Sequence, residues 1–210
     1  MLRKLIFPVV VLALITSNVK AQAPAATKTN YYSQLFGITY DINVPLGNDF
    51  VNKTSWAGFA LQYRYMIKHN LSAGIEVGWN QYHEYVPRKT YQVTDGAITT
   101  DLYTYIYTLP MALTLHKYFD AGKHVKPYAG IALGTTYSQQ KIFYNTYVSG
   151  DENWGFLARP EVGAIIKFNP NSGVGMLVGA RYSFSSNQQE TFKIDNLQSL
   201  GFQVGIIFAN

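Results

Sequence analysis

The sequence predicts an all-β protein, an eight-stranded antiparallel transmembrane β-barrel. Eight segments alternate apolar residues with polar or small ones at the two-residue period of a strand. The connections between them alternate between short turns and long polar loops. The composition agrees with this, because Tyr 17, Phe 12 and Gly 17 stand against only 14% charged residues, a balance typical of membrane-spanning sheet.

The N-terminal stretch MLRKLIFPVVVLALITSNVKAQ predicts a secretory signal peptide. Arg3 and Lys4 precede an apolar run over 5–15, and small residues follow up to Ala21. A membrane anchor is the alternative, but that run is too short for a bilayer core that needs about 20 apolar residues. We therefore expect a signal peptide over 1–21 that is cleaved after Ala21, a short periplasmic leader over 22–30 and one barrel domain over 31–210.

Charge and cysteine content exclude several classes of protein. Cleavage would remove Arg3, Lys4 and Lys20 and leave 14 of the 17 basic residues against 12 acidic ones, a net charge of only +2. No basic cluster interleaved with aromatic residues remains, so we expect no nucleic-acid partner. With no cysteine, the chain has no disulfide, no thiolate metal site and no lipidated cysteine.

The eight segments and their connections predict the topology of the barrel. The segments are 31–45, 55–67, 71–85, 101–116, 127–140, 154–168, 173–186 and 197–208. Short turns, KHN and NPNS, follow the second and sixth segments, whereas the expected long loops are 46–54, 86–100, 141–153 and 187–196. The link KYFDAGKHVK after the fourth segment departs from this pattern, and we interpret it as a solvated loop. Turns on one side and long loops on the other are typical of bacterial outer-membrane barrels.

The polarity of the faces decides between a membrane barrel and a soluble lipocalin-like barrel. One face of each segment is apolar and uncharged, as Met176 and Val178 illustrate, while Arg181 lies on the opposite face of the same segment. Aromatic residues gather toward the long loops (Trp79, Tyr103, Tyr137, Tyr182 and Phe184) and toward the turns (Tyr65, Phe168 and Phe208). Two such belts are typical of the aromatic girdles at a membrane's two interfaces. We therefore expect the apolar face to contact outer-membrane lipid.

These features resemble the porin-like outer-membrane β-barrel family, the small eight-stranded barrels of OmpA, OmpX and OmpW type. The resemblance rests on the signal sequence, the eight segments and the terminal stretch SLGFQVGIIFAN. That stretch is similar to the strand signal which the family presents to its barrel-assembly machinery, although it runs on for Ala209 and Asn210 past the aromatic Phe208. The resemblance implies a Gram-negative outer-membrane location and the assembly machinery as a partner, and it implies no particular activity.

Charged residues on the inward faces form the candidate site. Arg159, Glu161 and Arg181 lie on neighbouring segments joined by the turn near 169–172, and pairing across that turn places Glu161 level with Arg181. We expect a direct guanidinium–carboxylate contact between these two, with Arg159 adjacent. Arg64 and Glu76, which flank the KHN turn, predict a second inward pair. The network is either a gate whose ion pairs exchange partners or a structural plug, and the plug is favoured because polar interiors are general to small barrels.

We expect no catalytic, cofactor or metal site. His69, His83, His116 and His124 are scattered over turns and strand ends without ligand spacing, which predicts solvated or interfacial side chains. Family members that act on lipid A use a histidine with a nearby serine, and His83 has no such serine beside it. No Gly-x-Ser-x-Gly motif occurs either.

The sequence therefore favours a non-enzymatic structural or surface-binding protein with a polar, plugged lumen. The loops 86–100 and 141–153 would contact an unidentified extracellular ligand. The alternative is a narrow channel or transporter for small solutes, including apolar solutes that leave through the barrel wall.

Overall fold

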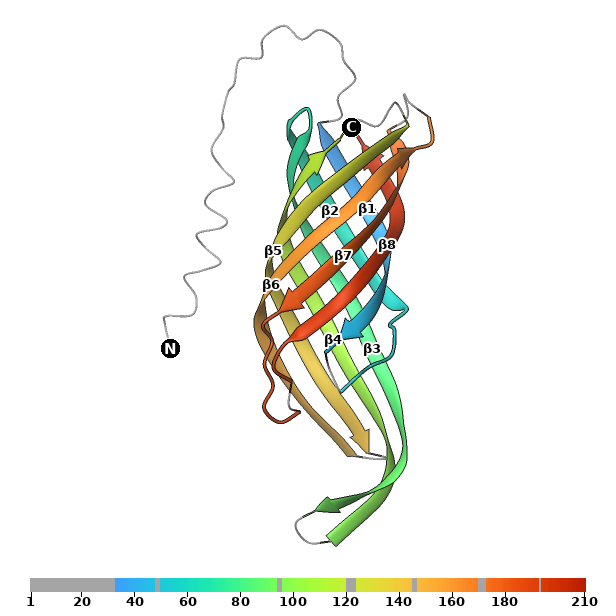
Figure 1. Cartoon of the computed structure of the whole chain (residues 1–210), viewed down its shortest axis with the longest axis vertical. Helices are drawn as coiled ribbons and strands as arrows, with labels where there is room; N and C mark the ends of the chain where they lie inside the picture. Colours follow the sequence, from blue (N-terminus) through green and yellow to red (C-terminus); the bar gives the residue numbers. More distant parts are fainter. Residues whose placement is uncertain are drawn as a thin grey trace, which may run out of the picture. The chain divides into compact units, whose positions relative to one another are not determined.

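The computed structural model describes residues 33–47, 50–93, 96–119, 124–144, 147–169, 173–192 and 194–210. The expected signal peptide and leader lie outside these residues. Eight strands within the described residues form one closed antiparallel barrel (Figure 1): β1 (Gln34–Leu46), β2 (Ala57–Lys68), β3 (Leu71–Val93), β4 (Gly96–Tyr118), β5 (Val125–Tyr144), β6 (Tyr147–Lys167), β7 (Val174–Ser185) and β8 (Leu197–Ala209). The predicted fold class is confirmed.

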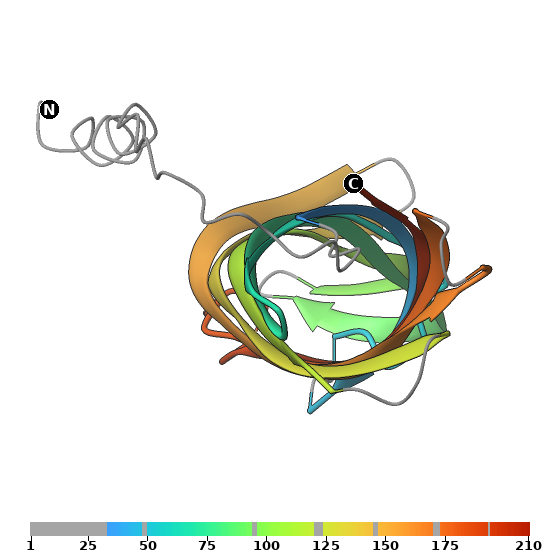
Figure 2. The ribbon, with the colours of Figure 1, turned by 90° about the horizontal axis from the view of Figure 1, so that it is seen from above.

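Pairing between the first and last strands closes the sheet. The register of β1 with β8 runs from Leu35 opposite Ala209 to Leu46 opposite Gln198, and the view along the barrel shows the resulting ring (Figure 2). Closure satisfies the backbone groups that an open edge would expose to lipid. Among the described residues, no helix is both long and apolar enough to cross a membrane.

Strand length differs between the ends and the middle of the sequence. β1, β2, β7 and β8 contain 12 or 13 residues each, whereas β3 to β6 contain between 20 and 23. A tilted strand crosses a bilayer in about 9–11 residues. The four middle strands therefore continue past the barrel wall at the loop end, where β3 and β4 project farthest (Figure 1).

The expectation that two ranges form long loops is largely wrong. The ranges 86–100 and 141–153 are mostly strand, because β3 and β4 pair as far as Val93 opposite Gly96, and β5 and β6 pair as far as Tyr144 opposite Tyr147. These ranges contain β-branched and aromatic residues, whose cross-strand pairs stabilise a ribbon even outside the membrane. Polar residues are mixed among them, so these ranges have the composition of loops and their strand propensity is not apparent from the sequence.

The outward and inward faces are as expected. Large apolar side chains such as Leu113, Val162 and Phe202 are exposed on the outside of the barrel. Aromatic residues at both ends, including Trp79 near the loops and Phe168 near the turns, are exposed as well. In water this surface would be an apolar band larger than soluble monomers tolerate, so it fits a lipid-facing wall.

Candidate functional site in the barrel lumen

Among the described residues, seven Asp, Glu, His and Arg side chains lie buried inside the barrel, each no more than 3% exposed. They are Asp41 on β1, Arg64 on β2, Glu76 on β3, His116 on β4, Arg159 and Glu161 on β6, and Arg181 on β7. Every one alternates along its strand with lipid-facing neighbours, which directs it inward. Among the described residues, three guanidinium groups thus share the lumen with three carboxylates, so opposite charges are balanced where desolvation makes an unpaired charge costly.

Arg181 links two carboxylates that belong to distant strands. Its Nη2 donates to Asp41 Oδ2 at 2.5 Å, and its Nη1 donates to Glu76 Oε1 at 3.1 Å. Arg159 Nη2 donates to the same Glu76 oxygen at 2.5 Å. The other oxygen of Asp41 accepts a hydrogen bond from Thr39 Oγ1 at 3.1 Å. Charge-assisted bonds of this kind are stronger than neutral ones and hold the four charged groups together.

Glu161 is the centre of the second group of charges. Its Oε1 lies within hydrogen-bond reach of His116 Nε2 and 3.7 Å from Arg64 Nη2, while its Oε2 lies 3.9 Å from Arg159 Nε. Arg64 also stacks on the ring of Tyr128, with its Cζ 4.6 Å from the ring centroid. Arg159 therefore joins the two groups into one network across the lumen.

Two glycines let side chains from strands two apart meet. Gly130 lies between His116 and Glu161 in the register, and a Cβ there would lie 2.4 Å from the His116 ring. Gly201 lies beside Arg181 on β8, where a Cβ would lie 3.0 Å from Arg181 Cγ. Larger residues at these two positions would block the close approach that each ion pair requires.

The structure changes the expected partners of the predicted site residues. Glu161 and Arg181 are opposite each other in the β6–β7 register, as expected, yet the ion pairs of Arg181 are with Asp41 and Glu76. The expected direct contact is replaced because the guanidinium reaches across Gly201 to β1.

The second expected pair, Arg64 with Glu76, is also replaced. Arg64 lies opposite Gly74 in the register and is paired with Glu161, whereas Glu76 is paired with Arg159 and Arg181. The turn between β2 and β3 brings the backbones of Arg64 and Glu76 close together, but each side chain pairs with residues from strands across the lumen.

Sequence reasoning missed two members of the network, Asp41 and His116. The expectation of a solvated or interfacial His116 is wrong, since the side chain is 0% exposed. Its position was readable from alternation: Leu113 and Leu115 face outward, so His116 faces inward. Asp41 has the same signal, because it alternates with the outward Tyr40. Among the described residues, no group of three or more His, Cys, Asp or Glu side chains could hold a metal ion.

Apolar clusters close the lumen on both sides of the network. The turn-end cluster consists of Leu35, Tyr118, Tyr128, Ile165, Leu177 and Ile207. The loop-end cluster consists of Val51, Tyr82, Ile106 and Ile194, and it includes residues from the first and last long loops. Phe50 and Phe192 pack beside it with ring centroids 5.0 Å apart. The loops thus fold into the mouth of the barrel.

Side chains leave a cavity between the network and the loop-end cluster. Its volume is about 50 Å³, and it is lined by Asn43, Asn80 and Thr108 together with Arg159 and Arg181. That volume suits one or a few water molecules. The described lumen therefore has an apolar, a charged and a second apolar layer in succession.

Comparison with known proteins agrees with this geometry. The chain matches the family model described as an outer membrane protein beta-barrel domain over residues 9–208. Comparison with curated proteins gives no match. Neisserial surface protein A, NspA, has the same fold, with 14% identity over 84% of this chain and 96% of that chain and a TM-score of 0.54.

Two further solved structures are similar at lower scores. Ail, the attachment invasion locus protein of Yersinia pestis, is 15% identical over 85% of this chain and 97% of its own, with a TM-score of 0.46. OprG of Pseudomonas aeruginosa is 13% identical over 85% and 96%, with a TM-score of 0.45. Because the family model covers nearly the whole sequence, the chain belongs to the family of outer membrane protein beta-barrel domains, and its location is the bacterial outer membrane.

Proposed function

We propose that this protein is a non-enzymatic barrel with a closed lumen, which acts at the cell surface through the hairpins β3–β4 and β5–β6. The observation that carries the proposal is the succession of closed layers in the lumen: the turn-end cluster, the ion network and the loop-end cluster. Moving a solute past them would separate buried ion pairs, which costs about 3–5 kcal/mol for each pair broken.

The two hairpins supply a surface for a partner. At the base of the hairpins, next to the aromatic belt, aromatic side chains pair across their strands: the ring centroids are 5.0 Å apart for the exposed Tyr85 and Tyr103 and 5.2 Å apart for the half-buried Tyr137 and the exposed Trp154. Aromatic residues are enriched in protein interfaces because they combine large contact area with few rotatable bonds. The strand pairing orders these side chains before a partner arrives, which lowers the entropy lost on binding.

Single-channel recording in planar bilayers tests the closed lumen. We expect no unitary current from the wild-type protein. A matched variant with Arg159→Ser and Glu76→Ser keeps the charges balanced but removes two long side chains from the plug, and it should pass more current. Stable unitary currents from the wild type would contradict the proposal and support the narrow-channel alternative.

Shortening the longer hairpin tests the surface role. Val86 and Leu102 are opposite each other in the register, so replacing 87–101 with Asn-Gly joins them through a two-residue turn that suits a hairpin. Whole cells displaying the two forms would be compared on a panel of immobilised glycans and matrix proteins. We expect binding by the full-length form to be lost in the shortened form, with equal amounts of folded barrel. Unchanged binding would show that the β3–β4 hairpin has no such role.

A further inference from the structure

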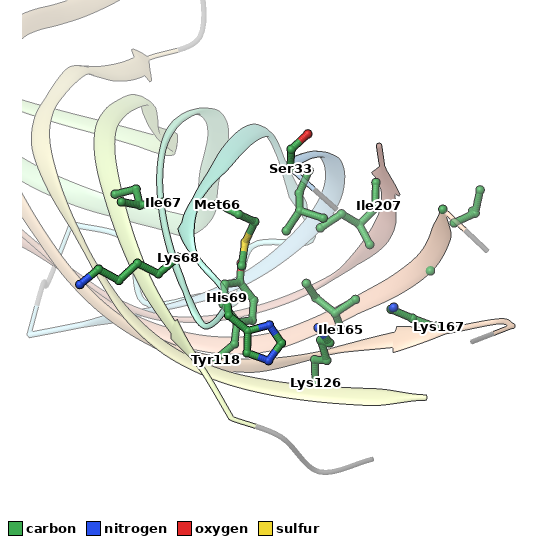
Figure 3. A pocket seen from close by; sticks show the side chains of 15 residues that line it. Ser33, Met66, Ile67, Lys68, His69, Tyr118, Lys126, Ile165, Lys167 and Ile207 are labelled. Carbon is green, nitrogen blue, oxygen red and sulfur yellow. The ribbon is translucent and has the colours of Figure 1, made fainter. Parts of the chain in front are cut away.

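A cavity of about 310 Å³ opens at the turn end of the barrel, beside the turn-end cluster (Figure 3). Its inner wall is apolar, with Leu35, Ile165 and Ile207 from the turn-end cluster and Met66 packed against them. The volume is near the lower end of the range of small-molecule pockets, about 300–1,000 Å³. In outer-membrane barrels this end faces the periplasm.

Positive charge is concentrated at the mouth of the same cavity. Lys68, Lys126 and Lys167 line it from β2, β5 and β6, together with His69. Lys126 and Lys167 are each two residues from an inward-facing side chain, Tyr128 and Ile165, so they lie on the same lumen face, and Figure 3 shows both near Ile165.

We infer that this cavity binds a medium-chain fatty acid from the periplasmic side. An apolar wall with two or three ammonium groups at its mouth complements an alkyl chain that carries one terminal carboxylate. The chain would lie against Leu35, Ile165 and Ile207, and the carboxylate would accept charge-assisted hydrogen bonds from Lys126 and Lys167. Neither the closed lumen nor the surface hairpins are needed for this site.

The methionines provide a direct readout of occupancy. Met66 lines the cavity, whereas Met111 and Met176 lie between buried, inward-facing neighbours on their strands and therefore face outward, away from the cavity. The barrel would be placed in phosphatidylcholine nanodiscs with isotope-labelled methionine methyl groups and titrated with dodecanoate at mildly alkaline pH by NMR. We expect a saturable shift of the Met66 signal alone. Equal shifts of all three signals would mean that dodecanoate only partitions into the bilayer, and this would overturn the proposal.

Related ligands test the apolar wall and the lysines of the cavity separately. Each methylene added between octanoate and dodecanoate should tighten binding about fourfold if the chain is buried. Dodecanol has the same chain without the charge and should bind at least about tenfold more weakly, because it lacks the charge-assisted bonds. Equal binding of dodecanol and dodecanoate would overturn the role of the lysines, and an affinity independent of chain length would overturn the apolar site.

Variants at the mouth complete the test. The double change Lys126→Gln with Lys167→Gln should weaken dodecanoate binding at least about tenfold, while Lys141→Gln, a control at the loop end, should leave it unchanged. The reversed pair, Lys126→Glu with Lys167→Glu, should bind dodecylammonium in place of dodecanoate. Unshifted Met111 and Met176 signals would verify that each variant is folded. Unchanged affinity in the Gln double variant would refute the site.

Discussion

Removing the guanidinium of Arg181 should destabilise the barrel mainly through Asp41. Glu76 would keep its bond from Arg159 at 2.5 Å, whereas Asp41 would keep only the hydroxyl of Thr39 at 3.1 Å. Asp41 is 0% exposed, so its charge would remain buried without a cation beside it. We expect Arg181→Ala to lower the free energy of unfolding by about 3–5 kcal/mol, the cost of breaking a buried pair from one side.

Removing both partners should cost less than the two single changes together. Asp41→Ala leaves Arg181 with Glu76, so we expect it to cost less than Arg181→Ala. The double variant contains neither unpaired charge, and its loss should be smaller than the sum of the single losses by about 2 kcal/mol, within the range measured for residues in contact. Glu161 supplies the matched control, because it is opposite Arg181 in the register but is bonded to His116. The Arg181 and Glu161 changes should be additive within about 0.5 kcal/mol.

Urea unfolding in lipid vesicles would give the free energies of unfolding of the wild type, the three single variants and the two double variants. Tryptophan fluorescence and the mobility of the folded barrel on gels would follow the unfolding. Strong coupling of Arg181 to Glu161 together with additive changes at Arg181 and Asp41 would refute the assignment of partners. It would instead favour the pairing that strand register alone predicts.

Two further predictions concern the wall and the topology. Val178→Arg places a charge on the lipid-facing side and should lower the free energy of unfolding by about 2–4 kcal/mol. The control Val178→Leu should lower it by less than about 1.5 kcal/mol. Equal losses for the two variants in urea unfolding would mean that the faces are reversed. Cysteines introduced at Asp95 and Asp151 should react with an impermeant thiol reagent on intact cells, and one at Asn171 should react only after the outer membrane is broken. Labelling in the opposite pattern would invert the proposed orientation.

Alternation along the chain was sufficient to predict eight strands and the inward direction of five of the buried charged side chains. Arg64, Glu76, Arg159, Glu161 and Arg181 were all placed inward from the two-residue period, and all are buried. The same rule applied to Asp41 and His116 would have found the rest of the network. The extent of the hairpins was missed, because their polar residues resemble loop sequence and only the pairing of Val93 with Gly96 and Tyr144 with Tyr147 reveals a ribbon.

The sequence by itself determined which residues face lipid and which face the lumen, since a strand sends successive side chains to opposite faces whatever its partner. It also indicated which end of the barrel carries the long connections, because short turns follow the second and sixth strands and long polar segments follow the odd-numbered ones. Only the tertiary structure decided which charges meet. Closure brings β1 beside β8, so Arg181 reaches Asp41 over Gly201, and Gly130 lets His116 reach Glu161 from two strands away. In a barrel just wide enough for its side chains to fill it, long side chains reach partners across the lumen, and strand register does not fix which partners they meet.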